Sequence, residues 1–384
     1  MASSSNPLAD VYGNLLIVRP PVPATVNKAG ANYKSEVAHL EYSPRRAYDE
    51  WLSICDGITS FGGDALFDFE PADDPLLDRG DLAVDGDGAI HPVGSRELLA
   101  RLDDVMTGRV FTANGPWMVV EGTELRGAMP HMLPHRRAEA PYYHHLLGRI
   151  AELGGYQLDL RDTPARWEGL ADVAVVGDRV VLTYTVAGHY DAGLPSKTPR
   201  SSREGVDFAA DLAGVPDAAR IHAELVYPHF HGDTVHFGAR PTAGAPVLVH
   251  FPGGLHGDGA ARVAAALGQD RIVPIDRHDA VEMYAGNSRQ VERGLLVPDG
   301  VSDDFLAAMQ RLGLAVTRVP LFELFGKAGG GPACATLYLP KNLSLPADAP
   351  IRYSVRRAEA QARRARLPER LLVDPAFFEG RARG

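Results

Sequence analysis

The sequence predicts an α/β fold built from a repeated unit, and two observations carry that prediction. First, helix-compatible segments end four times at a Leu-Gly or Ala-Gly step, and an apolar strand follows each of them. Glycine just past the last helical turn is the usual helix stop. Second, hairpin-like stretches lie between these pairs, as at 173–184, where a Gly-Asp step suits the turn. Units that repeat in this way predict one α/β domain with internal pseudo-symmetry.

The four helix–strand pairs occupy most of the chain after residue 140. They are, in order, 142–153 with 156–160, 208–212 with a more distant strand near 221, 260–267 with 271–275, and 303–312 with 315–319. Short apolar runs predict two further strands, at 246–251 and 294–298.

The N-terminal part begins with a strand and a helix. The strand, at 14–18, runs into consecutive prolines, which cannot continue a ladder. The helix is predicted at 43–58, because Ser43 and Pro44 form a typical cap and first turn. Cys55 falls on the apolar face of this helix and is expected to be a core residue.

Less regular segments surround the repeated units. The stretch 62–91 is rich in Gly, Asp and Pro and is predicted to be a surface loop. A second helix is predicted at 95–106, followed by a strand at 109–113. At the C-terminus, 341–384 contains an arginine-rich segment with little apolar face, which predicts a solvated basic helix.

Composition indicates a globular protein and excludes several function classes. The chain has 384 residues, a net charge of −10, 45% hydrophobic residues and 23% charged residues. An acidic balance disfavours a nucleic-acid or anionic-membrane surface. Two cysteines, Cys55 and Cys334, give no disulfide framework, and no signal peptide or apolar membrane run is visible. We therefore expect a cytoplasmic protein.

The chain's densest glycine run precedes the second cysteine. Three glycines, 329–331, lead to Pro332 and Cys334, and 336–339 is typical of a buried strand. Consecutive glycines fit a backbone that turns through positive φ or lies close against a ligand. A thiol held between such a loop and a strand is placed as a nucleophile would be. An inert cysteine at a strand end is the other interpretation that this segment allows.

This Gly-Gly-Gly-Pro-x-Cys-x-Thr pattern resembles the nucleophile loop of the guanidino-group-modifying enzymes. That group, the pentein superfamily, includes arginine deiminases, dimethylarginine dimethylaminohydrolases, arginine dihydrolases and amidinotransferases. The resemblance implies a five-bladed α/β propeller of ββαβ units. It also implies that Cys334 attacks the guanidinium carbon, because thiolate attack divides a hard displacement into two easier steps.

A second match lies at His231-Gly-Asp-Thr, which resembles the family's general acid/base segment. The resemblance assigns proton transfer to His231 and cation binding to Asp233. The same stretch leaves a metal-dependent hydrolase open, because His229, His231 and Asp233 resemble the start of a metal cluster. However, Thr234 stands where a metallo-β-lactamase-type motif has histidine. Histidines that serve only as core or surface residues are the remaining interpretation.

Two more motifs match in family order. A Glu-Gly-x-x-Asp segment before the 173–184 hairpin resembles a guanidinium-binding segment, which implies a catalytic, cation-gripping role for Glu168 and substrate binding by Asp172. A Phe-Thr-Ala-Asn segment ends at Asn114, where arginine deiminases have aspartate. Asn114 therefore points to the dihydrolase and dimethylargininase-like branch, as a residue that completes the substrate pocket.

Less specific matches add to the pocket. An arginine that binds the substrate carboxylate is expected in the segment 199–203, with Arg200 preferred and Arg203 as the alternative. An Ala-Gly-Asn step before another hairpin makes Asn287 an expected pocket residue.

Together these matches predict a cysteine-dependent enzyme acting on arginine or a similar small cationic guanidino compound, with no metal or organic cofactor. Hydrolysis is preferred, with an amidinotransferase as the alternative. A metal-dependent hydrolase and a non-catalytic binding protein are the alternative interpretations from other functional classes. We expect one catalytic domain at 1–340, with about 26–95 partly an insertion or divergent region, and a basic helical extension at 341–384. A homodimer is compatible with this interpretation.

Overall fold

Five small sheets, each with three strands, form the body of the molecule. The structure is a computed structural model and describes residues 7–21, 41–69, 82–84, 90–92, 110–133, 136, 139–186, 199–367 and 369–372. In each of the five sheets the first two strands are antiparallel, and the third strand pairs parallel to the second. A helix connects the second strand to the third. Each sheet with its helix is a ββαβ blade, which confirms the repeated unit predicted from the sequence.

Four blades are continuous in sequence. The first contains β6 (Trp117–Glu121), β7 (Glu124–Met129), α4 (Ala140–Gly154) and β8 (Gln157–Asp162). The second contains β9 (Val173–Val176), β10 (Arg179–Tyr184), α5 (Arg203–Leu212) and β11 (Arg220–Glu224). The third contains β12 (His236–Ala239), β13 (Val247–His250), α6 (Gly259–Leu267) and β14 (Ile272–Pro274). The fourth contains β15 (Arg289–Val291), β16 (Gly294–Pro298), α7 (Asp303–Arg311) and β17 (Ala315–Val319).

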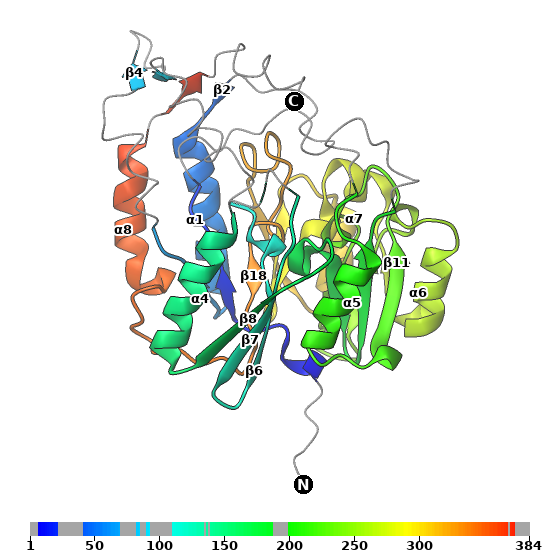
Figure 1. The fold of residues 1–384 in the computed structure, drawn as a ribbon. Helices are drawn as coiled ribbons and strands as arrows, with labels where there is room; N and C mark the ends of the chain where they lie inside the picture. Colours follow the sequence, from blue (N-terminus) through cyan, green and yellow to red (C-terminus); the bar gives the residue numbers. More distant parts are fainter. Residues whose placement is uncertain are drawn as a thin grey trace, which may run out of the picture.

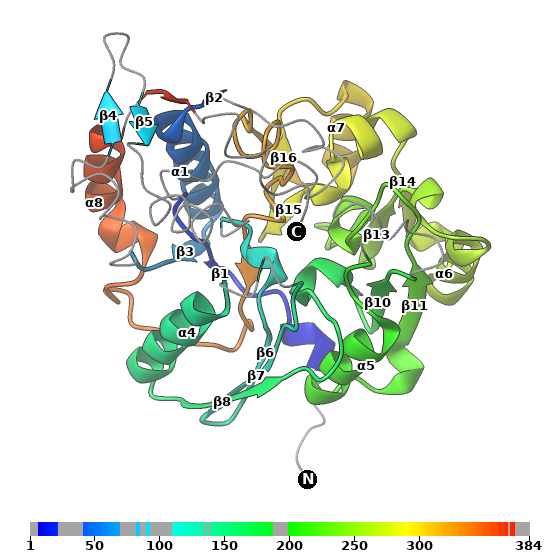
Figure 2. The ribbon, with the colours of Figure 1, turned by 45° about the horizontal axis from the view of Figure 1, so that its top comes forward.

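The fifth blade is assembled from the two ends of the domain. Its strands are β18 (Leu337–Tyr338), β1 (Leu15–Ile17) and β3 (Asp64–Leu66), with α1 (Pro44–Ser60) as the connecting helix. β3 lies inside the segment predicted to be a surface loop, and all three of its residues are buried. That part of the loop prediction is therefore wrong, because the short strand completes a sheet. Figures 1 and 2 show α1, α4, α5, α6 and α7 arranged around the strands.

Helix α1 begins, and α4 ends, at capping residues of the kind that the sequence predicts. The Ser43 side chain accepts a hydrogen bond from the Arg46 backbone N–H at 3.2 Å, and Pro44 occupies the first turn of α1. Cys55 lies fully buried on this helix, as predicted. Gly155 ends α4 in the left-handed conformation, with φ of 70°.

The C-terminal extension contains the predicted helix, α8 (Tyr353–Arg366), which packs along α1. Its arginines pair with carboxylates of α1 and of the region around β3. The contacts join Arg352 to Asp64, Arg356 to Asp68, Arg357 to Asp56 and Arg364 to Asp49. The helix is thus docked as well as solvated.

The rest of the described chain adds one more sheet and tests one of the two remaining local predictions. A four-stranded sheet combines β2 (Glu41–Tyr42), β19 (Leu371–Leu372), β5 (Ile90–Pro92) and β4 (Leu82–Val84). The strand predicted at 109–113 is wrong over its described residues, where a turn and a 3₁₀ helix occur. The helix predicted at 95–106 lies outside the described residues. None of the helices that the structure describes is long and apolar enough to cross a membrane.

A short turn precedes the first strand of every blade. Four of these turns are 3₁₀ helices: η3 (Thr112–Asn114), η5 (Gly169–Asp172), η9 (Gly232–Thr234) and η13 (Ala285–Asn287). The fifth is the turn at 332–335, before β18. Neighbouring turns contact one another, so the repeated fold gathers five equivalent turns at one end of the blades. The residues singled out by the sequence motifs lie on or next to these turns.

Candidate active site

The glycine run is explained by close approach to protein side chains. Gly329 has φ of +79°, which favours glycine. A Cβ on Gly330 would meet the Phe111 ring at 2.2 Å, and one on Gly331 would meet Asn287 Oδ1 at 2.9 Å. The loop therefore packs closely against Phe111 and Asn287, and this packing fixes the position of Cys334.

Asn287 holds the cysteine from the adjacent blade. Its Oδ1 accepts hydrogen bonds from the backbone N–H of Cys334 at 2.9 Å and of Gly331 at 3.0 Å. Its Nδ2 lies 3.0 Å from Cys334 Sγ and 3.1 Å from the carbonyl oxygen of Asp233. One amide thus connects the loop that carries Cys334 to η9, using the donor and the acceptor that asparagine offers.

Asp233 faces the thiol directly. Cys334 Sγ donates to Asp233 Oδ2 at 3.3 Å, and both side chains are buried. Burial and the nearby Asp233 charge raise the pKa of Cys334 well above its ordinary value. Burial likewise raises the pKa of Asp233, against the influence of His231. Within the described part of the chain, Asp233 Oδ1 is buried without a hydrogen-bond partner.

His231 precedes the same turn and contacts the second blade. Its Nε2 lies 2.8 Å from Glu168 Oε2 and 3.4 Å from Asn114 Nδ2. Because Glu168 can only accept when ionised, Nε2 carries the hydrogen of this contact. Nδ1 is then the ring nitrogen left to exchange a proton with a bound molecule.

Glu168 is the most heavily supported carboxylate of the site. It accepts from the Leu133 backbone N–H at 3.2 Å and from Arg200 Nη1 at 3.3 Å, and Arg136 Nη1 lies 4.0 Å away. Its side chain is fully buried. Burial opposes ionisation, but Arg200, His231 and Arg136 outweigh it and hold the pKa of Glu168 well below its ordinary value.

Asp172 is committed to protein contacts. Its Oδ1 accepts from Thr183 Oγ1 at 2.8 Å and from the Gly232 backbone N–H at 2.9 Å, and its Oδ2 accepts from Ser201 Oγ. Burial raises the pKa of Asp172 to about 6. The carboxylate therefore fixes the backbone between His231 and Asp233, and its predicted binding of substrate stays a prediction.

Asn114 joins the first and second blades. Its Nδ2 donates to the Glu168 carbonyl oxygen at 2.8 Å. Gly169 has φ of +81°, and a Cβ there would meet the backbone of Asn114 at 2.3 Å. The glycine of the Glu-Gly motif is thus required by both its conformation and this close approach.

The two candidate arginines differ sharply. Arg200 is buried beside Glu168, and its guanidinium lies 5.5 Å from the centre of the Phe230 ring. Arg203 is 62% exposed on α5 and pairs with Asp207. The structure therefore places Arg200, and not Arg203, among the site residues.

Sequence motifs missed Arg136, which is also buried at the site. Its guanidinium pairs with Glu139 through two hydrogen bonds, of 2.8 and 2.7 Å. An i, i+3 Arg–Glu spacing is a weak signal on its own. Only the folded structure shows that this pair lies against Glu168.

The three residues of the metal hypothesis do not converge. His229 Nδ1 lies 3.1 Å from Thr234 Oγ1, and its ring packs 5.6 Å from the Phe251 ring. Burial lowers the pKa of His229 to about 4. Among the described residues, no three His, Cys, Asp or Glu side chains are grouped as a metal ion would require.

Comparison with known proteins identifies the fold. No protein-family model matches the sequence, and no curated protein matches it. Among solved structures, it is similar to the product-bound N-terminal domain of ArgZ, an arginine dihydrolase from the cyanobacterial ornithine–ammonia cycle, with 18% identity and a TM-score of 0.59. The match covers 86% of this chain and 99% of that one.

Two other structures give the same result. Unliganded AgrE is 19% identical with a TM-score of 0.59, over 87% of this chain and 40% of that longer chain. A dimethylarginine dimethylaminohydrolase variant, in an adduct with S-methyl-L-thiocitrulline, is 14% identical with a TM-score of 0.54, over 85% and 100%. These likenesses confirm the pentein-type five-bladed α/β fold predicted from the sequence.

Proposed function

We propose that this protein is a guanidine-modifying hydrolase that cleaves a C–N bond of arginine or an arginine-like compound through a covalent intermediate on Cys334. One observation carries the proposal: Cys334 Sγ donates to one oxygen of Asp233, while the other oxygen is buried with no partner in the described residues. A buried carboxylate with a spare oxygen costs free energy unless a donor reaches it. A guanidinium bound there would bring its carbon beside the thiol.

The chemistry follows from this placement. As the Cys334 sulfur bonds to the guanidinium carbon, its proton leaves, and the departing nitrogen takes up one proton and leaves as ammonia. We assign the relay of that proton to His231, whose ring is hydrogen-bonded to Glu168. Water then adds to the carbon, the carbon–sulfur bond breaks, and the thiol, citrulline and one proton are released. A second round, in which citrulline and another water react, would release ammonia and carbon dioxide and leave ornithine.

The positive charge of the proposed substrate has a role in activating the thiol. The pKa of Cys334 is raised, so the thiol is neutral at rest. A guanidinium beside Asp233 adds positive charge next to the sulfur and favours the thiolate. The arginine dihydrolase and dimethylarginine hydrolase that share the fold support this substrate class.

The test is product analysis with L-arginine and N-methylated arginines. We expect the wild type to release citrulline or ornithine, together with ammonia from L-arginine or a methylated amine from the N-methylated arginines, and oxygen-18 from labelled water should appear in the ureido group of citrulline. Cys334→Ala, purified in parallel, should give none. Product formation that is unchanged in Cys334→Ala would overturn the proposal. Release of ornithine that requires an added amine, with no ammonia, would identify the amidinotransferase instead.

A further inference from the structure

Arg289 lies two residues after Asn287 and grips the same nucleophile turn. Its Nε donates to Thr336 Oγ1 at 2.7 Å. Its Nη2 donates to the carbonyl oxygens of Ala333 at 2.7 Å and of Thr336 at 2.9 Å. The two carbonyls flank the segment that carries Cys334, so one guanidinium closes this turn with three charge-assisted hydrogen bonds.

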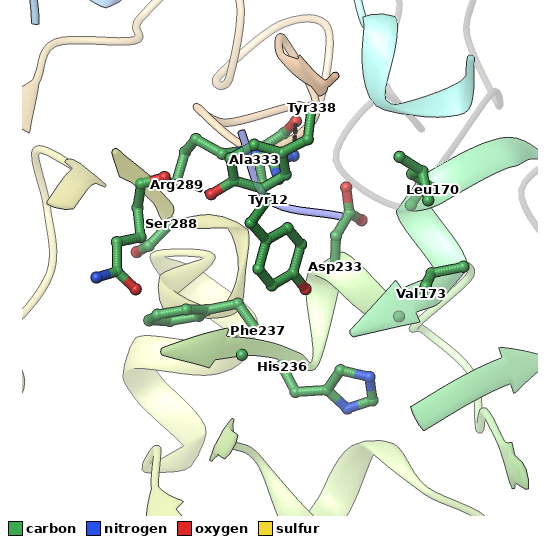
Figure 3. A pocket seen from close by; sticks show the side chains of 14 residues that line it. Tyr12, Leu170, Val173, Asp233, His236, Phe237, Ser288, Arg289, Ala333 and Tyr338 are labelled. Carbon is green, nitrogen blue, oxygen red and sulfur yellow. Dashed lines mark hydrogen bonds between the residues drawn. The ribbon is translucent and has the colours of Figure 1, made fainter. Parts of the chain in front are cut away.

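Arg289 and Asn287 hydrogen-bond to different backbone atoms of this turn. Arg289 lines a cavity of about 30 Å³, together with Asp233, Ala333 and Tyr338. Figure 3 shows Arg289 between Ala333 and Ser288 at this cavity, with Asp233 facing the same space. The guanidinium carbon lies 4.3 Å from the centre of the Tyr338 ring, which fixes its plane. Asn287 holds the backbone N–H groups of the turn, and Arg289 holds the carbonyls.

We propose that Arg289 is a positioning residue for the nucleophile, and that the burial of the Cys334 thiol depends on its hold on the turn at 333–336. The claim that this positioning serves catalysis rests on the proposed function. The claim about the thiol does not. If the hold is lost, the carbonyls of Ala333 and Thr336 turn toward water, and the turn opens locally. Water then reaches Sγ and relieves the burial that keeps the thiol neutral.

The charge of Arg289 has a separate effect, on Asp233. Burial raises the pKa of this carboxyl, and four neighbouring groups lower it: His231, Cys334, Arg289 and Asn287. Removing the charge therefore raises the pKa of Asp233, and the carboxylate needed to bind a cation forms only at higher pH. Lysine would keep the charge but cannot reproduce the three-point hold.

The experiment compares Arg289→Lys and Arg289→Met with a matched control, Arg271→Met. Arg271 also binds two backbone carbonyls, those of Pro246 and Val176, but lies away from the site. Each full-length protein is treated with iodoacetamide across a pH range, and labelling of Cys334 and Cys55 is read separately by peptide mass spectrometry. Cys55, fully buried in the core, reports global opening.

We expect both Arg289 variants to label at Cys334 at least about tenfold faster than the wild type near neutral pH, with Cys55 protected. Arg271→Met should behave as the wild type. Equal labelling in all variants, or labelling of Cys334 only together with Cys55, would overturn the inference. These outcomes need no substrate, so they separate this inference from the proposed function.

Turnover gives the second readout when arginine is a substrate. Both variants should lower kcat by about tenfold or more, which corresponds to a barrier higher by roughly 1.4 kcal/mol. Only Arg289→Met should also move the acidic limb of kcat/KM to higher pH. A kcat equal to that of the wild type in both variants would contradict the positioning role, whatever the labelling shows.

Discussion

Cys334, Asp233 and Asn287 form one side of the candidate site, which we call the thiol side, and His231, Glu168, Arg200 and Arg136 form the other, the imidazole side. On the thiol side, burial raises the pKa of both acids, so negative charge is disfavoured. On the imidazole side, two arginines and a histidine hold the pKa of Glu168 well below its ordinary value. The residues of both sides are buried.

The difference lies in the partners. Glu168 is ionised because the protein supplies its cations, whereas Asp233 has an oxygen for which the described residues supply none. Under the proposed function, the substrate brings the positive charge that Asp233 lacks. The four predictions that follow probe the two sides in turn.

The largest effect is expected from Cys334→Ser. If Cys334 is the nucleophile, as we propose, its loss should lower kcat by about 10⁴-fold or more. Because the resting thiol is neutral, the substitution changes no charge, and the arginine Kd from calorimetry should change by no more than about threefold. A variant that loses binding as completely as turnover would show that the sulfur is already a thiolate at rest.

Glu168→Gln breaks the imidazole side. It leaves Arg200 and Arg136 buried with one carboxylate fewer, and removing one partner of a buried ion pair costs about 3–5 kcal/mol. Urea unfolding should show this loss, and turnover by the folded fraction should fall as well. Stability equal to that of the wild type would mean that the arginines do not depend on Glu168.

Asp233→Asn tests the thiol side with the opposite sign for stability. The raised pKa means that the unfolded chain ionises this carboxyl more readily, so its charge destabilises the native state above that pKa. The variant should therefore unfold at a higher temperature than the wild type near pH 7. Its stability should also vary less with pH just above the ordinary aspartate range.

The same substitution should weaken binding of a cation. A hydrogen bond to a charged group contributes about 1.5–3 kcal/mol, so KM for arginine should rise by about 10–100-fold. Iodoacetamide should label Cys334 faster near neutral pH, because the neighbouring charge no longer raises the thiol pKa. An unchanged KM would remove Asp233 from the binding site.

Asp172→Asn should have the smallest effect, and it tests whether Asp172, which we assign to neither side, binds substrate. The amide keeps one acceptor for Thr183 and the Gly232 N–H but cannot accept from Ser201 in the same way. We expect about 1 kcal/mol of lost stability and a kcat lower by about fivefold, with Kd for arginine unchanged. A Kd raised tenfold or more would restore the substrate-binding role predicted from the sequence.

Much of the fold could be predicted because its signals are local. Glycine stops, apolar strands and hairpin turns repeat along the chain, and they became four complete blades. β3 was missed because a buried strand of three residues inside a Gly- and Asp-rich segment has no periodicity to show. The 109–113 segment resembles a strand in composition, yet Thr112 bonds across to the Ile17 carbonyl and the backbone turns.

The candidate site was predictable where short motifs carry it. Cys334, Asn287 and Asp233 lie in contact, as do His231, Glu168 and Asn114. Arg136 and Arg289 were missed because their role comes from which carbonyls and carboxylates the blades bring near them, and an arginine has no spacing that signals this. The hydrogen bonds that Asp172 accepts from Thr183, Ser201 and the Gly232 N–H likewise exist only in the folded chain.

The most direct measurement is the mass of the intact protein after acid quench during turnover of L-arginine, with Cys334→Ser as the control. The account predicts that Cys334 gains about 157 Da, the mass of arginine less ammonia, in the wild type and that Cys334→Ser gains nothing. A gain of about 42 Da would mean that ornithine leaves first and that the amidino group is transferred. No adduct on Cys334, in a protein that turns arginine over, would contradict the central claim.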